Sequence, residues 1–160
     1  MARGEKRSAA RLAAVQALYQ MDLAGSPLAD IFAEFESFWI GREVEGEAYK
    51  PAEIAFFRDI VDGVVRNQRQ IDPPIDETLA AGWPLRRIEA VLRAVLRAGA
   101  YELSNRRDVP ARVVISEYAD VAGAFMDRDE VGMVNAVLDQ LARRYREAEF
   151  ETPSGRIQRS

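Results

Sequence analysis

Residues 84–104 read PLRRIEAVLRAVLRAGAYELS, and this stretch decides the fold. Its apolar or small residues recur every three or four positions, which is the spacing of one face of an α-helix: Leu85, Ile88, Leu92, Val95 and Gly99. Pro84 suits the first helical position, because the N–H group that it lacks would have no partner there. Gly99 costs the helix about 1 kcal/mol relative to alanine, but it lets a second helix approach closely. The stretch therefore predicts a central helix against which the other elements pack.

The composition excludes several classes of protein. The 160 residues are enough for one domain with a sizeable core. The chain has no Cys and no His, so it has no disulfides or thiol chemistry and lacks the usual zinc ligands and nucleophile–base pairs. No apolar run approaches the ~20 residues that a membrane helix needs, and the N-terminus has no apolar export signal. We expect a cytoplasmic protein without a metal or a cofactor.

The remaining patterns predict an all-α protein of about seven helices, and the short connections between them favour antiparallel packing of neighbouring helices in bundles. Besides the central helix they place helices at 5–24, 28–40, 51–71, 75–81, 110–125 and 128–149. We expect residues 41–50 to form a loop and residues 151–160 a disordered tail. We also predict that Asp72-Pro73-Pro74 stops the third helix, because proline lacks an N–H group.

Local signals refine these helices. Asp127 and Glu130 have the spacing of a capping box. Gly25 suits the end of the first helix. The run Val113–Ile115 follows Pro110 within a helical period, so we predict helix there and no strand. The core candidates of that helix are Val113, Val114, Tyr118, Val121 and Phe125.

The N-terminal helix is basic, although the chain as a whole carries a net charge of −4. Its cationic residues fall on one side of the helix: Arg3, Lys6, Arg7 and Arg11. The predicted buried stripe is Leu12, Val15, Tyr19 and Leu23. Arginine side chains pair with phosphates, and an aromatic ring such as Tyr19 suits stacking with the bases of a single strand. The alternative is a solvated basic face with Tyr19 in the core.

Other candidate sites have structural explanations. Arg86, Arg93 and Arg97 form a row on the central helix, and ion pairs with the local Glu89 account for much of it. The carboxylates show no repeated ligand spacing, and no phosphate-binding glycine loop is present. Asn135, which lies between apolar residues, is typical of a hydrogen-bonded group in a core or between helices.

Several segments, in order, resemble the NusB family of transcription antitermination factors. They are AAVQALYQMDL at 13–23, FFRDIVDGV at 56–64, VLRAGAYELSNRRDVPARVVISEYADVA at 95–122 and VNAVLDQLA at 134–142. The resemblance implies one NusB-like RNA-binding domain over residues 1–150, with sub-bundles at about 1–82 and 83–150. It also implies that the chain is not an enzyme.

The resemblance implies further partners and a cellular role. The family binds the single-stranded boxA element of ribosomal RNA transcripts together with the ribosomal protein NusE. The pair acts with other Nus factors on the elongating RNA polymerase, and some members form homodimers. No membrane is involved.

The resemblance also assigns residues. It places RNA contacts at Arg7, Arg11 and Tyr19, with Arg3 and Lys6 as local additions. Asp129 matches an acidic position before the last helix where substitution alters antitermination. Met133 stands where many members have an aromatic residue linked to RNA contact. Leu92 stands where many members have Glu, and with Arg93 it is the candidate partner contact. Arg97 and Asn135 match positions that we interpret as structural.

Two alternative readings remain from sequence. One is a non-catalytic helical protein-interaction module that does not bind RNA itself. A related helical domain is fused to RNA cytosine methyltransferases, but this chain has no α/β cofactor-binding region. The other is an enzyme that uses carboxylates.

Overall fold

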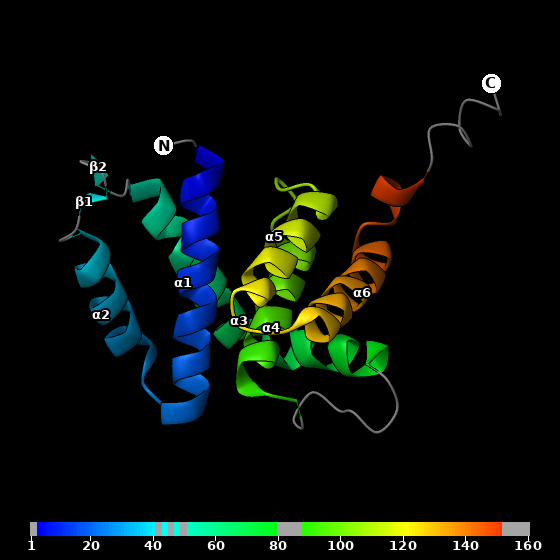
Figure 1. Ribbon diagram of the computed structural model, residues 1–160, viewed down its shortest axis with the longest axis horizontal. Helices are drawn as coiled ribbons and strands as arrows, with labels where there is room; N and C mark the ends of the chain where they lie inside the picture. The colour runs from blue at the N-terminus through cyan, green and yellow to red at the C-terminus, as the bar shows by residue number, and fades with distance from the viewer. Residues whose placement is uncertain (1–2, 41–42, 45–46, 49–50, 80–87, 152–160) are drawn as a thin grey trace.

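The predicted all-α fold is confirmed by a computed structural model, which describes residues 3–40, 43–44, 47–48, 51–79 and 88–151 (Figure 1). Side chains are described for 7–37, 53–79 and 88–151. The elements are α1 (Arg3–Ala24), α2 (Leu28–Ile40), β1 (Glu43–Val44), β2 (Glu47–Ala48), α3 (Pro51–Thr78), α4 (Ala90–Asn105), α5 (Ala111–Gly123), α6 (Arg128–Tyr145) and the 3₁₀ turn η2 (Glu147–Phe150). The expectations for residues 82–86 and for the tail from 152 lie outside the described residues.

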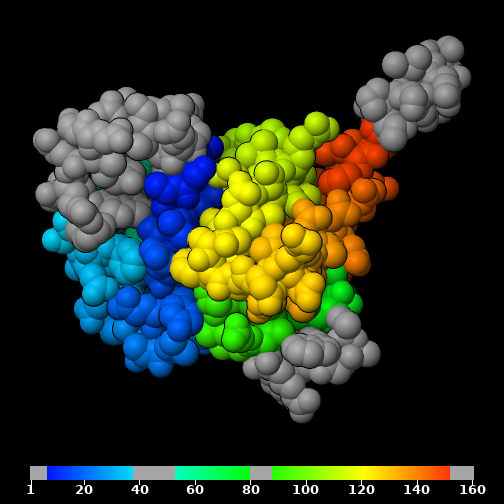
Figure 2. Space-filling model, in the orientation of Figure 1, coloured from blue at the N-terminus to red at the C-terminus, as the bar shows by residue number. Residues whose placement is uncertain are grey.

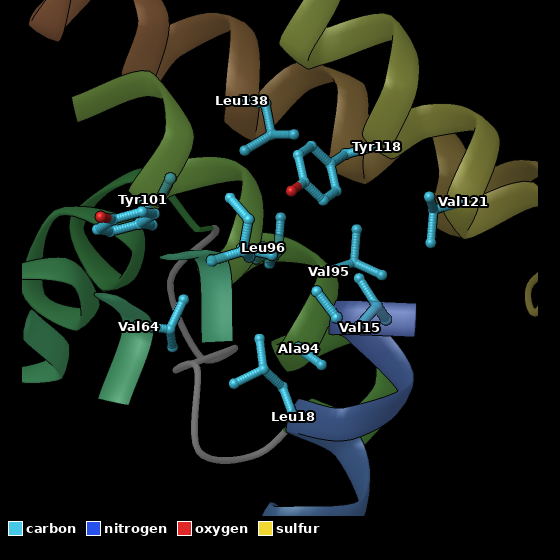
Figure 3. Close-up of a cluster of buried hydrophobic side chains, with 14 of the residues drawn as sticks. Val15, Leu18, Val64, Ala94, Val95, Leu96, Tyr101, Tyr118, Val121 and Leu138 are labelled. Carbon is cyan, nitrogen blue, oxygen red and sulfur yellow. The ribbon is translucent and has the colours of Figure 1, made fainter. Parts of the chain in front are cut away.

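Helix α4 is the centre of the molecule, since α1, α3, α5 and α6 all pack against it. Figure 3 shows side chains from these helices converging on Val95 and Leu96 of α4, which are fully buried. Tyr118 of α5 and Leu138 of α6 approach from one side, and Val15 of α1 from the other. One continuous core therefore joins the first and last helices through α4.

The predicted continuous helix over 84–104 is wrong, because Ile88 and Glu89 are not helical, whereas Pro84 itself lies outside the described residues. Helix α4 begins at Ala90, and its preceding residue Glu89 has an extended ψ of 146°. The first helical hydrogen bond runs from the Arg93 N–H to the Glu89 carbonyl, at 2.9 Å. Ile88 lies before the helix but is buried in the core. Its apolar character extended the predicted stripe, because burial before a helix and burial in its first turn give the same sequence pattern.

The buried face of α1 is lined by alanines together with only part of the predicted stripe. Ala10, Ala14 and Ala17 are fully buried, whereas Tyr19 is 39% exposed and Leu23 is 62% exposed. Small side chains let neighbouring helices approach closely, and Val15 and Leu18 are buried among the alanines, with Leu12 partly buried against the core. The prediction was right for Val15, but Tyr19 and Leu23 are available to a partner.

Helix α3 continues through the predicted stop at Pro73 and Pro74 and ends at Thr78. Its bend lies earlier, at Asn67, where φ is −110° and ψ is 16°. The side-chain amide Nδ2 of Asn67 donates a hydrogen bond to the backbone carbonyl of Gly63 at 2.8 Å. A proline ring fixes φ near the helical value, so the chain beyond this bend stays helical and loses only two N–H donors.

Two glycines are positions of close helix contact. A Cβ atom added to Gly99 would lie 2.8 Å from a terminal methyl of Leu138, which confirms the predicted close approach. A Cβ added to Gly63 of α3 would overlap the ring of Tyr101, a contact that the sequence did not reveal. These glycines set how closely α6 and α3 pack against α4.

Several local predictions about helix ends and individual side chains can be compared with the structure. The capping box of Asp127 and Glu130 is present, and Val113–Ile115 is helical, as predicted. Gly25 has a φ of 67° after α1, which suits glycine at a helix end. Val113 and Phe125 are about two-fifths exposed, so their predicted burial is wrong. The predicted loop over 41–50 contains the antiparallel pair β1 and β2.

In the described part of the chain, no helix is both long enough and apolar enough to span a membrane. The same residues contain no group of three or more acidic side chains placed to hold a metal ion.

Candidate nucleic-acid interface

Arg11, a predicted RNA contact, is buried in the interior and is only 2% exposed. Its Nε and Nη2 donate to the two carboxylate oxygens of Glu102 at 2.7 and 3.1 Å, and its Nη1 donates to Glu117 at 2.8 Å. Glu102 is fully buried and also accepts the hydroxyl of Tyr118. Glu117 accepts the hydroxyl of Ser8. The expected role of Arg11 in RNA contact is therefore revised to a structural one, since its donors join α1 to α4 and α5.

Electrostatics in this network favour the ion pair. Burial alone would lower the pKa of Arg11, but the hydrogen bond and the charge of Glu102 outweigh it, and the pKa is raised. Burial, followed by the charge of Glu102, raises the pKa of Tyr118 well above its ordinary value. Arg11 is thus a fixed cation and Tyr118 a fixed donor on either side of Glu102.

Three guanidinium groups surround one buried ring at the N-terminal end of α1. The ring of Phe56 is 2% exposed, and the guanidinium carbons of Arg7, Arg11 and Arg106 lie 4.6, 4.9 and 4.9 Å from its centroid. Cations are attracted to the face of an aromatic ring at such distances. Figure 1 shows the α4–α5 turn, which carries Arg106, at the same end as the N-terminus of α1. Arg7 and Arg106 are both about one-fifth exposed, so they form the solvent side of this group.

Carboxylates balance the two outer arginines. The Nε and Nη2 of Arg106 donate to the two oxygens of Asp108, both at 3.0 Å, and its Nη1 donates to Asp59 at 2.9 Å. An Nη1 atom of Arg7 lies 3.8 Å from Asp108. The hydrogen bonds from Arg106 lower the pKa of Asp108 to about 2. Asp59 also accepts the Tyr101 hydroxyl at 2.7 Å; burial, followed by that hydrogen bond, raises the pKa of Tyr101 above its ordinary value.

Tyr19 is exposed on α1 but does not share a face with Arg7. Twelve residues separate them, which corresponds to about 18 Å along the helix and about 120° around it. Tyr19 lies beside the exposed Leu23 on the solvent side. The expected single basic and aromatic face is therefore revised to two patches on α1. The side chains of Arg3 and Lys6 lie outside the described residues.

The first turns of α6 contribute further candidates. Asp129 is exposed in the first turn, and Met133 one turn later is half-buried against the core. Asn135, interpreted as an internal polar group, is exposed instead. Helices α1 and α5 are in contact, and Figure 2 shows the surface of α1 bordered by α5 and the start of α6.

Of the two candidate partner contacts on α4, Leu92 is buried and Arg93 is partly exposed. Leu92 is 3% exposed and belongs to the core, so its expected contact role is revised to packing. Arg93 donates to Asp22 of α1 at 2.8 and 3.1 Å, and Arg97 donates to Asp72 of α3 with two bonds of 2.9 Å. These arginines pair with carboxylates of other helices, and not with Glu89 as expected. Arg86 lies outside the described residues.

A shallow pocket with a volume of ≈ 290 Å³ lies between α1, α3 and α4. Leu18, Met21 and Val64 supply apolar lining, and Asp22 and Arg97 supply charge. Because Asp22 is paired with Arg93 and Arg97 with Asp72, these two charged groups are already neutralised.

Sequence reasoning missed Glu102, Arg106 and Phe56. Glu102 stands three residues after Gly99 on the apolar face of the central helix, and a charge at such a position is a signal for a buried ion pair. Nothing local in the sequence predicts the stacking on Phe56, because its partners come from α1 and from the α4–α5 turn.

The chain matches a family model described as the NusB family over residues 8–143. It is 72% identical over 148 residues to the transcription antitermination protein NusB of Rhodopseudomonas palustris (strain ATCC BAA-98 / CGA009), covering 92% of this chain and 85% of the relative. It is 70% identical over 148 residues to the protein of the same name in Bradyrhizobium diazoefficiens, covering 92% of this chain and 90% of that one.

Solved structures share the fold. T. maritima NusB matches with a TM-score of 0.75 and 28% identity, over 91% of this chain and 97% of that one. A crystal structure of the antitermination factors NusB and NusE in complex with dsRNA matches with a TM-score of 0.73 and 27% identity, over 91% of this chain and 100% of the other.

Proposed function

The chain belongs to the NusB family, and we propose that it is a transcription antitermination factor that binds single-stranded boxA RNA together with NusE. The RNA is that of ribosomal RNA transcripts, and the complex acts on the elongating RNA polymerase with other Nus factors. The observation that carries the proposal is the similarity, over nearly the whole chain, to relatives named transcription antitermination protein NusB. The likeness to a NusB–NusE complex that holds RNA supports both partners.

The proposed RNA contacts are the candidates that the fold leaves accessible. Arg7 supplies a cation for a backbone phosphate, and the half-buried cation–ring contact with Phe56 holds its guanidinium in place. Tyr19 presents an exposed ring on which a base can stack. Asp129 and Met133 border the RNA from the start of α6. Arg3 and Lys6 extend the basic end, whereas Arg11 and Leu92 support the fold.

The proposed role needs no catalysis. The protein brings RNA and NusE together, and its place of action is the cytoplasm, where ribosomal RNA is transcribed. A homodimer that covers the RNA-binding surface is a further proposed state, and adding RNA shifts it toward the monomer.

The test is fluorescence anisotropy of labelled RNA, with and without NusE. We expect single-stranded boxA RNA to bind more tightly than a scrambled sequence and to bind more tightly still when NusE is added. Each phosphate neutralised should contribute about −0.7 to the slope of log K against log salt. Equal binding of the scrambled RNA, or no effect of NusE, contradicts the proposal and favours a protein-interaction module. A boxA duplex belongs in the same experiment, because the related complex holds dsRNA.

Matched variants locate the contacts. Arg7→Ala should weaken RNA binding about tenfold and reduce the salt slope by about one phosphate. Arg66→Ala removes an exposed arginine of α3 and serves as its control.

Tyr19→Ala should weaken RNA binding by about 1–3 kcal/mol, the range for stacking on one base. Tyr19→Phe keeps the ring and should stay close to the wild type.

A further inference from the structure

The arginine cluster at the end of α1 has one component whose position bears on RNA binding, namely Asp108. Its carboxylate takes two hydrogen bonds of 3.0 Å from Arg106 and lies 3.8 Å from a nitrogen of Arg7. The three side chains come from the start of α1 and from the turn after α4. Asp108 therefore occupies an anion position shared by two cations.

The exposure of these side chains shows which of them an incoming ligand meets first. Asp108 is 52% exposed, whereas the arginine side chains are 22% and 23% exposed. Asp59, the other carboxylate on Arg106, is 33% exposed and is also held by Tyr101. An anion arriving from solvent can thus replace Asp108 without opening the core, and the displaced carboxylate moves into water.

The guanidinium groups of Arg7 and Arg106 are preorganised to bind an anion in place of Asp108. Both guanidinium groups lie over the buried ring of Phe56, at 4.6 and 4.9 Å from its centroid, so they lose little further freedom when a ligand binds. A guanidinium binds a phosphate with the same paired N–H donors that it offers to a carboxylate. Arg106 has a second partner in Asp59, so it stays fixed when Asp108 leaves.

We infer that Arg7 and Arg106 form a binding site for a backbone phosphate of RNA, and that Asp108 fills this site in the free protein and competes with the RNA. This inference rests on the proposed function and adds two residues to it. Arg106 is a binding residue, and Asp108 is an intramolecular competitor that sets the affinity.

The test compares Asp108→Asn, which removes the competing charge with little change in shape, with Asp120→Asn, which removes an exposed carboxylate from α5. In the anisotropy assay we expect Asp108→Asn to tighten boxA RNA binding about fivefold, equivalent to about 1 kcal/mol, and Asp120→Asn to change it less than twofold. Arg106→Gln should weaken binding about tenfold, and its neighbour Arg107→Gln serves as the control for lost charge. The increase in RNA affinity caused by Asp108→Asn should disappear when Arg106→Gln is also present.

Two results overturn the inference: an Asp108→Asn variant that binds like Asp120→Asn, or a gain that persists without Arg106. Circular dichroism checks that each variant is folded. A measurement on the wild-type chain does not depend on that check: the Nε–Hε NMR signal of Arg106, assigned from its loss in Arg106→Gln, should shift when RNA is added. An unshifted signal at saturating RNA contradicts the site even if Asp108→Asn fails to fold.

The remaining outcomes separate this inference from the proposed function. Inorganic phosphate at matched ionic strength should leave the Arg106 signal in place, and a shift with phosphate but none with RNA would assign the site to free phosphate. If the wild-type chain binds no boxA RNA with or without NusE, the proposed function fails and this inference fails with it. If it binds RNA but Asp108→Asn equals its control, only this inference fails.

Discussion

Arg7 and Arg11 lie four positions apart on α1, but their guanidinium groups have different surroundings. Arg11 is enclosed with Glu102 at 2.7 Å, whereas Arg7 lies at the solvent side of the Phe56 ring. Spacing of four residues places side chains on nearly the same side of a helix, but it does not tell which neighbour covers them. The two arginines therefore need separate tests.

Arg11→Met should lower the free energy of unfolding by about 3–5 kcal/mol, because it leaves the buried charge of Glu102 without its cation. Adding Glu102→Gln should recover part of that loss, since the remaining group is neutral. Urea unfolding followed by circular dichroism measures both, with Arg7→Ala as the comparison that should lose little stability. An Arg11→Met variant that keeps its stability but loses RNA affinity contradicts the structural role.

Because the pKa of Asp108 is lowered in the folded state, we predict that the protein loses stability in acid. That pKa is about 2, against an ordinary value of 3.8. A lowered folded pKa adds stability that is fully present above pH 3.8 and is lost as the pH falls through 2. Thermal melting between pH 5 and 2 should therefore show a smaller acid-induced loss for Asp108→Asn than for the wild type. Asp120→Asn should follow the wild type, and an unchanged acid loss in Asp108→Asn would rule out the Arg106 pairing.

The site was only partly predictable from single residues. Arg7 and Tyr19 were named from charge and chemistry, and the structure leaves both accessible. Arg106 and Asp108 were not named, because their importance arises from contact with α1, about a hundred positions away in sequence. Leu92 was misplaced because a family position was carried over without its burial.

At the scale of elements, close contacts at glycine fix how the helices pack. Gly63→Ala should lower the free energy of unfolding by about 3 kcal/mol, at the upper end for overpacked cores. The new methyl overlaps the Tyr101 ring, whose hydroxyl is bound to Asp59. Gly99→Ala should cost less, because its two shortest contacts, 2.8 and 2.9 Å, are with the terminal methyls of Leu138, and because alanine has the higher helix propensity.

The control for this prediction is a double-mutant cycle. Gly63→Ala should destabilise the Tyr101→Ala background much less than the wild type, because the overlapping ring is gone. The urea unfolding midpoints of the four proteins give the coupling free energy between positions 63 and 101. An equal loss in both backgrounds would show that Gly63 acts through something other than Tyr101.

Asp127 should stabilise the start of α6 on its own. Its carboxylate accepts the Glu130 N–H at 3.2 Å, and the Glu130 carboxylate accepts the Asp127 N–H at 3.4 Å. Replacing such a cap with alanine costs about 1 kcal/mol. Asp127→Ala measured by urea unfolding checks this, and Asp120→Ala, within α5, is the control.

Helix identity was predictable, whereas helix ends and buried faces were less so. Periodicity identified α1, α4, α5 and α6, because their core faces repeat every three or four residues. The end of α3 was missed because Pro73 and Pro74 have a helical φ and follow the bend at Asn67. The inner face of α1 was only partly predicted, because the alanines that line much of it give no strong apolar signal.

At the scale of the whole molecule, α4 joins α1 to α5 and α6 through one core. The Arg11–Glu102 pair adds a polar link across the same junction. Arg7 at one end of α1, Tyr19 on its solvent face and Met133 on α6 are thus held in a fixed relation.

The most direct test of this account is an NMR titration of the 17.9 kDa chain with single-stranded boxA RNA. We predict that the NMR signals of Arg7, Tyr19, Asp129 and Met133 shift, whereas those of the exposed face of α3 around Val65 and Arg66 stay unchanged. Shifts confined to α3, or no shifts at RNA concentrations that saturate the NusE-bound chain, would contradict the proposed RNA surface.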